Sequence, residues 1–338
     1  LSVAPIPVST FDDVKYDGFY RRFNQEKNFP EIAGKDLRAY FNFDTKEGEQ
    51  IKVKFALSAV STNGALNNLK TEIPHWDFDK TREETRKKWN KELGKIDVKT
   101  ITEQDLITFY TALYHTNLSP ILYEDVDGRY RGLDQNIYHS DGFVNYTIFS
   151  LWDTYRALHP LFNITQPQRN NDMVKSMLAH HDQSVHKMLP IWSHYANENW
   201  CMIGYHATSV IADAMAKGVG NFDQHRALQA SVNTASVEYF DGLGDYIKYG
   251  YVPDDKSHSS VSKTLEYSYN DWCIAQMAER IGDDALKKQF LSRSENYKHV
   301  YDPNIGFMRP KLSDGKFRQD FDPMDTHGQG FIEGNAWN

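Results

Sequence analysis

Residues 204–218, GYHATSVIADAMAKG, hold the clearest structural signal in this chain. The segment up to Lys217 has the composition of a helix, and Gly218 stands where helices commonly end on a left-handed glycine. Its alanines have small side chains that let a neighbouring helix approach closely: Ala207, Ala212, Ala214 and Ala216. The segment therefore predicts a helix that packs against other helices.

Similar helical segments lie on both sides of this one. Residues 145–159 carry Ile148, Leu151, Tyr155 and Leu158 at helical spacing before Pro160, which predicts one helix that ends there. Further helices are predicted at residues 104–117, 171–188, 223–240, 259–280 and 283–299. We see no strand-like run among them and no fixed repeat period, which favours an α/α barrel over a repeat solenoid.

The N-terminal part has a different pattern. Residues 51–57, IKVKFAL, alternate strictly and predict a strand, and residues 37–43 alternate loosely. Two strands cannot form a stable sheet alone, so we expect residues 1–75 to be the C-terminal part of a β-sandwich. The charged residues 76–100 are predicted to form a linker helix. Residues 101–338 then form the helical domain of an α+β multidomain chain.

Composition excludes some classes of protein. The chain has 338 residues, of which 40% are hydrophobic and 25% charged, which is ordinary for a soluble globular protein. It has no apolar run of 18 residues, so no membrane span is expected. A net charge of −8 argues against a nucleic-acid partner. Cys201 and Cys273 each lie beside a tryptophan and are predicted to be buried free thiols.

The stretch 325–338, DTHGQGFIEGNAWN, offers a candidate general acid. Glu333 lies between Ile332 and Gly334, and Trp337 follows four residues later. A carboxyl among apolar side chains loses water and favours its protonated form, as a general acid requires. The alternative is a surface glutamate in a glycine-rich turn.

Trp152, Asp153 and Arg156 form a second candidate group. A tryptophan beside a carboxylate and a guanidinium can bind a sugar by stacking and by hydrogen bonds to its hydroxyls. The alternative is a surface pair of Asp153 and Arg156 beside a packed tryptophan.

His206, Glu266 and Asp271 complete the candidate set. His206 begins the alanine-rich helix, where it could bind a substrate hydroxyl or cap the helix. Glu266 and Asp271, followed by Trp272, could hold a sugar hydroxyl or orient Arg156, or they could satisfy buried backbone groups.

Two patterns suggest metal binding only weakly. His180, His181, Asp182 and His186 lack the spacing of known zinc sites and are interpreted as a polar helix face. The segment from Asp125 lacks the later ligands of a calcium loop and is interpreted as a turn.

Residues 330–337, GFIEGNAW, resemble a signature of glycoside hydrolase family 92, the calcium-dependent exo-acting α-mannosidases. Three upstream stretches resemble the same family in the same order: TIFSLWDTYRALHPL at 147–161, IGYHATSVIADA at 203–214 and SKTLEYSYNDWCIA at 262–275. The resemblance implies an N-terminal β-sandwich and a C-terminal (α/α)₆ barrel. It also implies that Glu333 is the general acid.

The resemblance further implies an inverting enzyme that releases mannose from glycans outside the cytoplasm of a bacterium. The family places the catalytic base and most calcium ligands downstream, so we expect no metal ligand here and an internal fragment that is inactive without the rest of its barrel. Another α/α-barrel glycoside hydrolase or phosphorylase, or a non-catalytic carbohydrate-binding protein, stays open.

Overall fold

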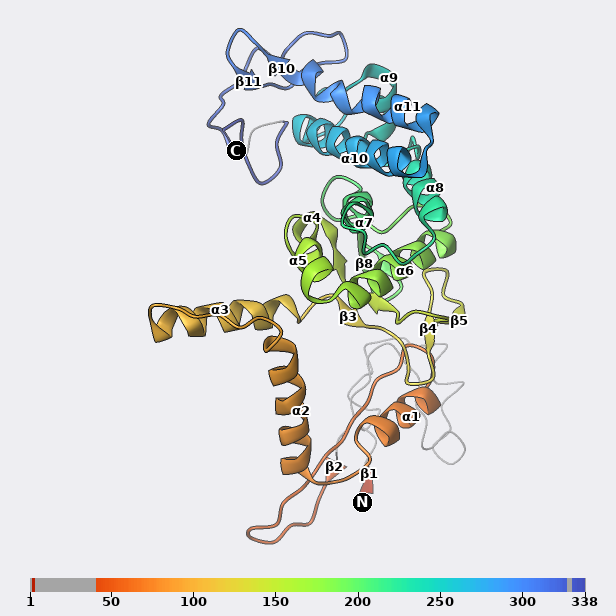
Figure 1. Cartoon of the computed structure of the whole chain (residues 1–338), viewed down its shortest axis with the longest axis vertical. Coiled ribbons are helices and arrows are strands. Elements are labelled where there is room, and N and C mark those ends of the chain that lie inside the picture. The colour runs from red at the N-terminus through yellow and green to blue at the C-terminus, as the bar shows by residue number, and fades with distance from the viewer. Residues whose placement is uncertain (1, 4–40, 327–329, 338) are drawn as a thin grey trace, which may run out of the picture. The chain divides into compact units, whose positions relative to one another are not determined.

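Figure 1 shows the computed structural model, which describes residues 2–3, 41–326 and 330–337. The chain divides into two compact units, Leu1–Lys54 and Phe55–Asn338. In the first unit, strand β1 (Ser2–Val3) pairs antiparallel with β2 (Phe41–Asn42). Most of the predicted β-sandwich segment lies outside the described residues.

The predicted strand at residues 51–57 is wrong. This segment is in no helix and pairs with no strand among the described residues, and Val53, Phe55 and Leu57 are more than three-quarters exposed. Alternation alone does not make a strand without a partner. Helix α1 (Thr62–Glu72) follows in a region that we predicted to be β-structure, and its N-terminus is capped by the side chain of Ser61.

Two helices lead into the helical region. Helix α2 (Phe78–Leu93) confirms the charged helix predicted in residues 76–100, and Asp77 caps it. Helix α3 (Glu103–Thr116) is capped by Thr102, as expected from the sequence. The segment beginning at Asp125 is a turn, as predicted: the amide of Gly128 donates to the carbonyl of Asp125 at 2.8 Å.

Short strands interrupt the helices, contrary to our prediction. They are β3 (Ile121–Leu122), β4 (Arg129–Arg131), β5 (Ile137–His139), β6 (Tyr146–Thr147), β7 (Phe149–Ser150), β8 (Trp192–His194) and β9 (Asn197–Glu198). Strand β3 pairs with β6, β4 with β5, and β7–β8–β9 form a three-stranded sheet, all antiparallel.

The single helix predicted at residues 145–159 is also wrong. Strands β6 and β7 occupy its first half, and Ile148 between them has a φ of 65°, which a helix does not allow. Helices α4 (Leu151–Thr154) and α5 (Leu158–Thr165) follow. Pro160 lies in the first turn of α5, where its missing N–H breaks no helical hydrogen bond.

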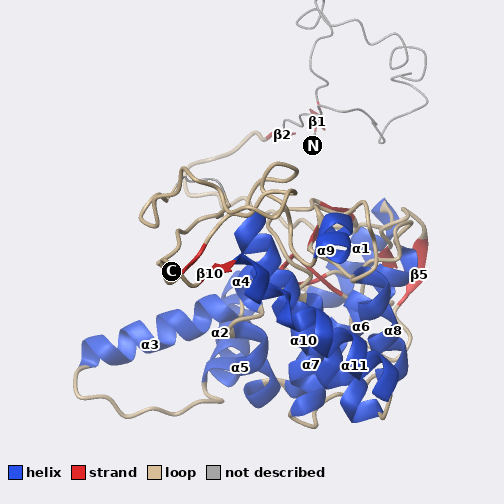
Figure 2. Ribbon diagram, turned by 90° about the horizontal axis from the view of Figure 1, so that it is seen from above, coloured by secondary structure: helices blue, strands red, loops and turns tan. Residues whose placement is uncertain are grey.

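The remaining helices largely confirm the predicted order. They are α6 (Pro167–Gln183), α7 (Ala207–Ala216), α8 (Gln224–Thr234), α9 (Leu243–Tyr249), α10 (Ser260–Ile281), α11 (Asp284–Ser294) and the 3₁₀ helix η2 (Glu295–Val300), followed by the hairpin of β10 (Tyr301–Asp302) and β11 (Phe307–Met308). Helix α10 contacts α7, α8, α11 and η2, and Figures 1 and 2 both show it beside α11. Gly282 and Asp283 alone connect α10 to α11, so the two helices form a tight hairpin.

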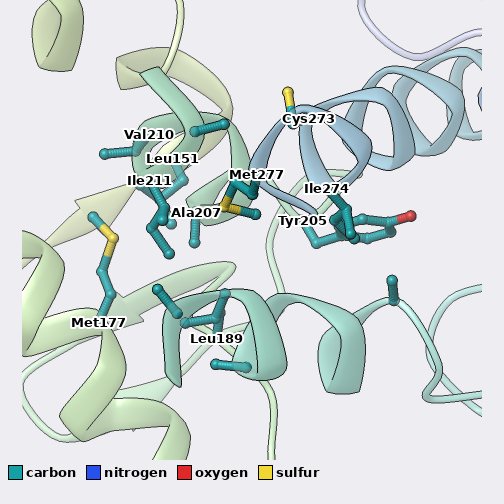
Figure 3. Close-up of a cluster of buried hydrophobic side chains, with 14 of the residues drawn as sticks. Leu151, Met177, Leu189, Tyr205, Ala207, Val210, Ile211, Cys273, Ile274 and Met277 are labelled. Carbon is teal, nitrogen blue, oxygen red and sulfur yellow. The ribbon is translucent and has the colours of Figure 1, made fainter. Parts of the chain in front are cut away.

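The core lies where α6, α7, α8 and α10 pack together, and Figure 3 shows part of it. Met177, Ile211 and Ile274 point into this cluster and have no exposed surface. Cys273 joins it as a buried free thiol, as predicted. Cys201 is also free, but it is exposed, so the prediction that it is buried was wrong.

Candidate active site

Glu266 of α10 is the point at which three segments meet. Its side chain is 17% exposed and lies 3.6 Å from the guanidinium of Arg156 and 3.3 Å from Nε2 of His206. Burial raises the pKa of Glu266, while the charge of Arg156 and the nearby indole of Trp152 oppose that rise. The structure therefore brings Trp152, Arg156, His206 and Glu266 together, although they are up to 114 residues apart in the sequence.

Arg156 is held by aromatic faces on its own segment. Its guanidinium carbon lies 4.5 Å from the ring centre of Trp152 and 4.7 Å from that of Tyr155. Its Nε also donates to the backbone carbonyl of Trp152 at 3.2 Å. The indole Nε1 of Trp152 is buried without a hydrogen bond of ordinary geometry, although it lies near enough to Glu266 to lower the pKa of that carboxyl.

His206 is buried and stacked. Its ring lies parallel to Tyr155 at a centroid distance of 4.1 Å, and its Nδ1 lies 3.1 Å from the amide nitrogen of Asn270. Burial, and secondly the charge of Arg156, lower the pKa of His206 to about 3. The imidazole is therefore neutral near pH 7.

The loop that carries Glu333 docks on the N-terminal end of α10. The amides of Val261 and Ser262 both donate to the carbonyl of Gly330, at 2.9 and 3.0 Å, and the amide of Ile332 donates to Ser262 Oγ at 3.2 Å. Glu266 follows Ser262 by about one helical turn. One helix thus positions both the candidate acid and the cluster around Glu266.

Glu333 itself has a left-handed backbone with a φ of 49°, which is uncommon for a residue other than glycine. Such strained backbone is concentrated at functional sites. Its side chain is exposed, so the expected enclosure by apolar neighbours is not present among the described residues. Trp337 is also exposed, with its ring packed edge-on against Phe307 at 5.5 Å.

Two sequence candidates lie apart from this cluster. Asp153 is on the exposed side of α4. Asp271 is five residues beyond Glu266 and so faces another side of α10. Its carboxylate has no exposed surface and accepts hydrogen bonds from the hydroxyls of Tyr205 and Tyr246 and from Nε of Arg293. Asp271 thus pairs with buried side chains, rather than with the buried backbone groups that the alternative named.

The interpretation of the histidine pattern as a polar helix face is wrong for His180 and His181, which are largely enclosed on α6, and His186 lies beyond the end of that helix. Within the described ranges, no three His, Cys, Asp or Glu side chains are placed to hold a metal ion. His180 is enclosed instead, 3.5 Å from Glu198, and burial lowers its pKa to about 3.

Sequence reasoning missed Asn270 and Gly204 as residues of the site. Both lie in stretches that resemble family 92, but only the structure places them beside His206. Tyr155 was visible only as a member of an apolar stripe. Its ring in fact supports both His206 and Arg156.

Comparison with known proteins decides the family. A sequence model of the glycosyl hydrolase family 92 catalytic domain matches residues 64–338. The chain belongs to this family. The α-mannosidase BT3965 from Bacteroides thetaiotaomicron, also solved in complex with mannoimidazole, is 49% identical, with a TM-score of 0.79 over 82% of this chain and 37% of its own.

Two further similar proteins show the same relation. The inverting mannosidase BT2199 from Bacteroides thetaiotaomicron is 32% identical, with a TM-score of 0.77 over 83% of this chain and 39% of its own. An uncharacterized secreted glycosidase of Arthroderma benhamiae is 26% identical over 79% of this chain and 34% of its own length. The chain thus spans little more than a third of these relatives. No helix in the described part of the chain is long and apolar enough to cross a membrane.

Proposed function

We propose that the full-length protein hydrolyses terminal α-linked mannose from glycans with inversion at the sugar. The observation that carries this proposal is the docking of the Glu333 loop on α10, one turn from the cluster of Glu266, Arg156 and His206. The names of two solved relatives, an α-mannosidase bound to mannoimidazole and an inverting mannosidase, support the substrate and the stereochemistry.

Each site residue has a role that its chemistry allows. Glu333 donates a proton to the leaving oxygen as the general acid. Arg156 and Glu266 hydrogen-bond sugar hydroxyls, because a guanidinium donates and a carboxylate accepts. Trp152 and Trp337 offer aromatic faces for stacking on the sugar.

The polar residues Asp153 and His206 are assigned by the same chemistry. The carboxylate of Asp153 reaches solvent and can accept from a hydroxyl. The neutral ring of His206 supports Glu266 from the buried side. Asp271 supports α10 from within the core.

Other parts of the enzyme supply what the described residues do not. Inversion needs a second carboxylate about 6.5–9.5 Å from the acid, with a water molecule between them. We assign this base, and the remaining helices of an (α/α)₆ barrel, to the part of the protein outside residues 1–338. The described residues offer no cluster that fits calcium, so a calcium requirement is an expectation from the family and none of the roles above depends on it.

The test is Glu333→Gln in the full-length protein. Hydrolysis of mannosides with poor leaving groups should fall by about 10²–10⁴-fold, since they need protonation, whereas activated aryl mannosides should lose much less. Glu279→Gln, on an exposed glutamate of α10, is the matched control and should keep activity on both substrates. Equal losses on both substrates would show that Glu333 is not the acid.

Product analysis separates the proposal from its rivals. Release of mannose as the β-anomer is expected. Release of glucose, or phosphorolysis, would identify another α/α-barrel carbohydrate enzyme. Mannose binding without turnover would identify a binding protein.

The secreted relative also supports a site of action outside the cytoplasm.

A further inference from the structure

Asn270 faces His206 from within α10 and has no exposed surface. Its side-chain oxygen accepts from the backbone N–H of Tyr205 at 2.8 Å. A backbone N–H can only donate, so this contact fixes which end of the amide is the oxygen. The NH₂ group of Asn270 must then point at Nδ1 of His206, 3.1 Å away. Because that NH₂ group donates, Nδ1 accepts, and the single proton of the neutral ring lies on Nε2.

We propose that Asn270 is a positioning residue that holds the His206 ring proton on Nε2, directed at the carboxylate of Glu266. The proposal rests on the proposed function, because it assigns Asn270 a role in the same sugar-binding cluster. Asn270 lies in the stretch 262–275 that resembles family 92, but that resemblance gives it no role. The assignment comes from the order of donors and acceptors that runs from Tyr205 through Asn270 and His206 to Glu266.

The tautomer of His206 with its proton on Nδ1 would repel Glu266. Nε2 of His206 lies 3.3 Å from Oε2 of Glu266. An unprotonated Nε2 would turn its lone pair toward a negatively charged oxygen, whereas a proton there attracts it. Nε2 makes no hydrogen bond of full geometry in the structure, so its contact with Glu266 is mainly electrostatic, and the backbone carbonyl of Ile203 is a second acceptor near the ring. The ring cannot tilt away easily, because Tyr155 covers one face.

A second buried pair in the same fold has the opposite arrangement. Asp213 accepts from the amide nitrogen of Asn163 at 2.8 Å, so the oxygen of Asn163 accepts from Asn170 at 2.6 Å. The oxygen of Asn170 then faces Nδ1 of His159 at 2.7 Å. By the same reasoning, His159 carries its proton on Nδ1. The two histidines are therefore internal references for each other.

Nitrogen NMR of the full-length protein labelled with ¹⁵N-histidine tests the assignment directly. His206 should show a protonated Nε2 and His159 a protonated Nδ1 near neutral pH, with each signal assigned by its loss in His206→Gln or His159→Gln. A proton on Nδ1 of His206 would overturn the proposal whatever the enzyme's activity. Loss of hydrolysis in Glu333→Gln together with that result would leave the proposed function intact and this inference wrong.

Asn270→Asp tests the consequence for the site. The carboxylate still accepts from the Tyr205 amide but cannot donate to Nδ1, so the proton moves to Nδ1 or the ring becomes charged. The charged and titratable groups that face the ring are Glu266, Arg156 and Tyr155, and the backbone carbonyl of Ile203 also acts on it. We expect kcat/KM to fall by about tenfold or more, the size of effect seen when a residue that orients a metal-binding side chain is lost. The pH profile of kcat/KM should also change.

Asn170→Asp is the matched control, because it introduces the same charge beside a buried histidine away from the site. The new carboxylate can still accept from Nδ1 of His159, so kcat/KM and its pH profile should stay within about twofold of the parent. Equal changes of kcat/KM in the two variants, or an unchanged pH profile in Asn270→Asp, would show that Asn270 has only a structural role. If Asn270→Asp does not fold, the NMR assignment of the parent protein decides.

Discussion

At the scale of single residues, the position of His206 depends on a glycine two residues before it. Gly204 has a φ of +82°, and a Cβ built there would lie 2.3 Å from Nε2 of His206. Non-bonded heavy atoms do not approach so closely, so any side chain at this position must displace the ring. The orientation of His206 toward Glu266 therefore requires glycine for two reasons, backbone conformation and space.

Gly204→Ala tests that requirement, with Gly218→Ala as its control. Gly218 also has a positive φ, +71°, but a Cβ there meets nothing within 4 Å. The left-handed backbone destabilises both variants by about 1–2 kcal/mol, and overpacking destabilises Gly204→Ala by about a further 1–3 kcal/mol. Denaturant unfolding should show this difference, and only Gly204→Ala should lower kcat/KM. Equal behaviour of the two variants would contradict the close packing around His206.

The site residues that could be predicted from the sequence are those that stand out within a short local motif. Trp152, Arg156, His206 and Glu266 were expected from residue type and resemblance, and they do converge. Asn270 and Tyr155 could not be expected, because their roles arise from contacts across 64 and 51 residues of sequence. The exposure of Glu333 could not be read from its apolar neighbours, since exposure depends on what packs over a loop.

At the scale of elements, α10 separates two kinds of carboxylate on two of its faces. Glu266 faces the candidate site, while Asp271 lies in the core and joins α10 to α11 through Arg293. Burial raises the pKa of Asp271 to about 6, although Arg293 and two tyrosine hydroxyls oppose the rise, so the carboxyl is ionised at pH 7. The ionised Asp271 therefore neutralises the largely buried guanidinium of Arg293.

Asp271→Asn should lower the stability of the protein without weakening substrate binding. Removing one partner of a buried ion pair costs about 3–5 kcal/mol, because the other charge is left unpaired. We expect such a loss in the free energy of unfolding and an unchanged KM for mannosides in the folded fraction. Glu279→Gln, in the exposed pair with Lys287, should cost at most about 1 kcal/mol. A raised KM with unchanged stability in Asp271→Asn would instead place Asp271 on the substrate.

Helices could be predicted where the helical pattern was long and no strand pairing competed with it. Residues 259–280 became α10 almost unchanged, because Gly282 ends it and its buried residues recur at helical spacing. Residues 145–159 failed because strand pairing to β3 and β8 outweighs a helical period in a short segment. Local spacing cannot report a partner strand that lies tens of residues away.

At the scale of the whole molecule, buried neutral histidines should set the acid limit of stability. Burial lowers the pKa of His159 to about 4 and of His180 and His206 to about 3, against about 6.5 when unfolded. Between these values the unfolded chain binds a proton and the folded chain does not. Stability from these groups is therefore complete above pH 6.5 and is lost as pH falls toward 3–4. Asp271 acts in the opposite sense, since its raised pKa makes the folded state bind a proton between about pH 4 and 6.

Three histidines opposed by Asp271 take up about two protons on unfolding near pH 5, and the raised pKa values of Glu198 and Glu266 reduce that number further. At about 1.4 kcal/mol per proton per pH unit, these groups should lower the free energy of unfolding by at most about 2–3 kcal/mol for each unit of acidification. Denaturant unfolding of the full-length protein from pH 7 to 4 measures the slope. His159→Gln, away from the candidate site, should reduce it by about one proton, whereas an unchanged slope would mean that His159 is already protonated in the folded state.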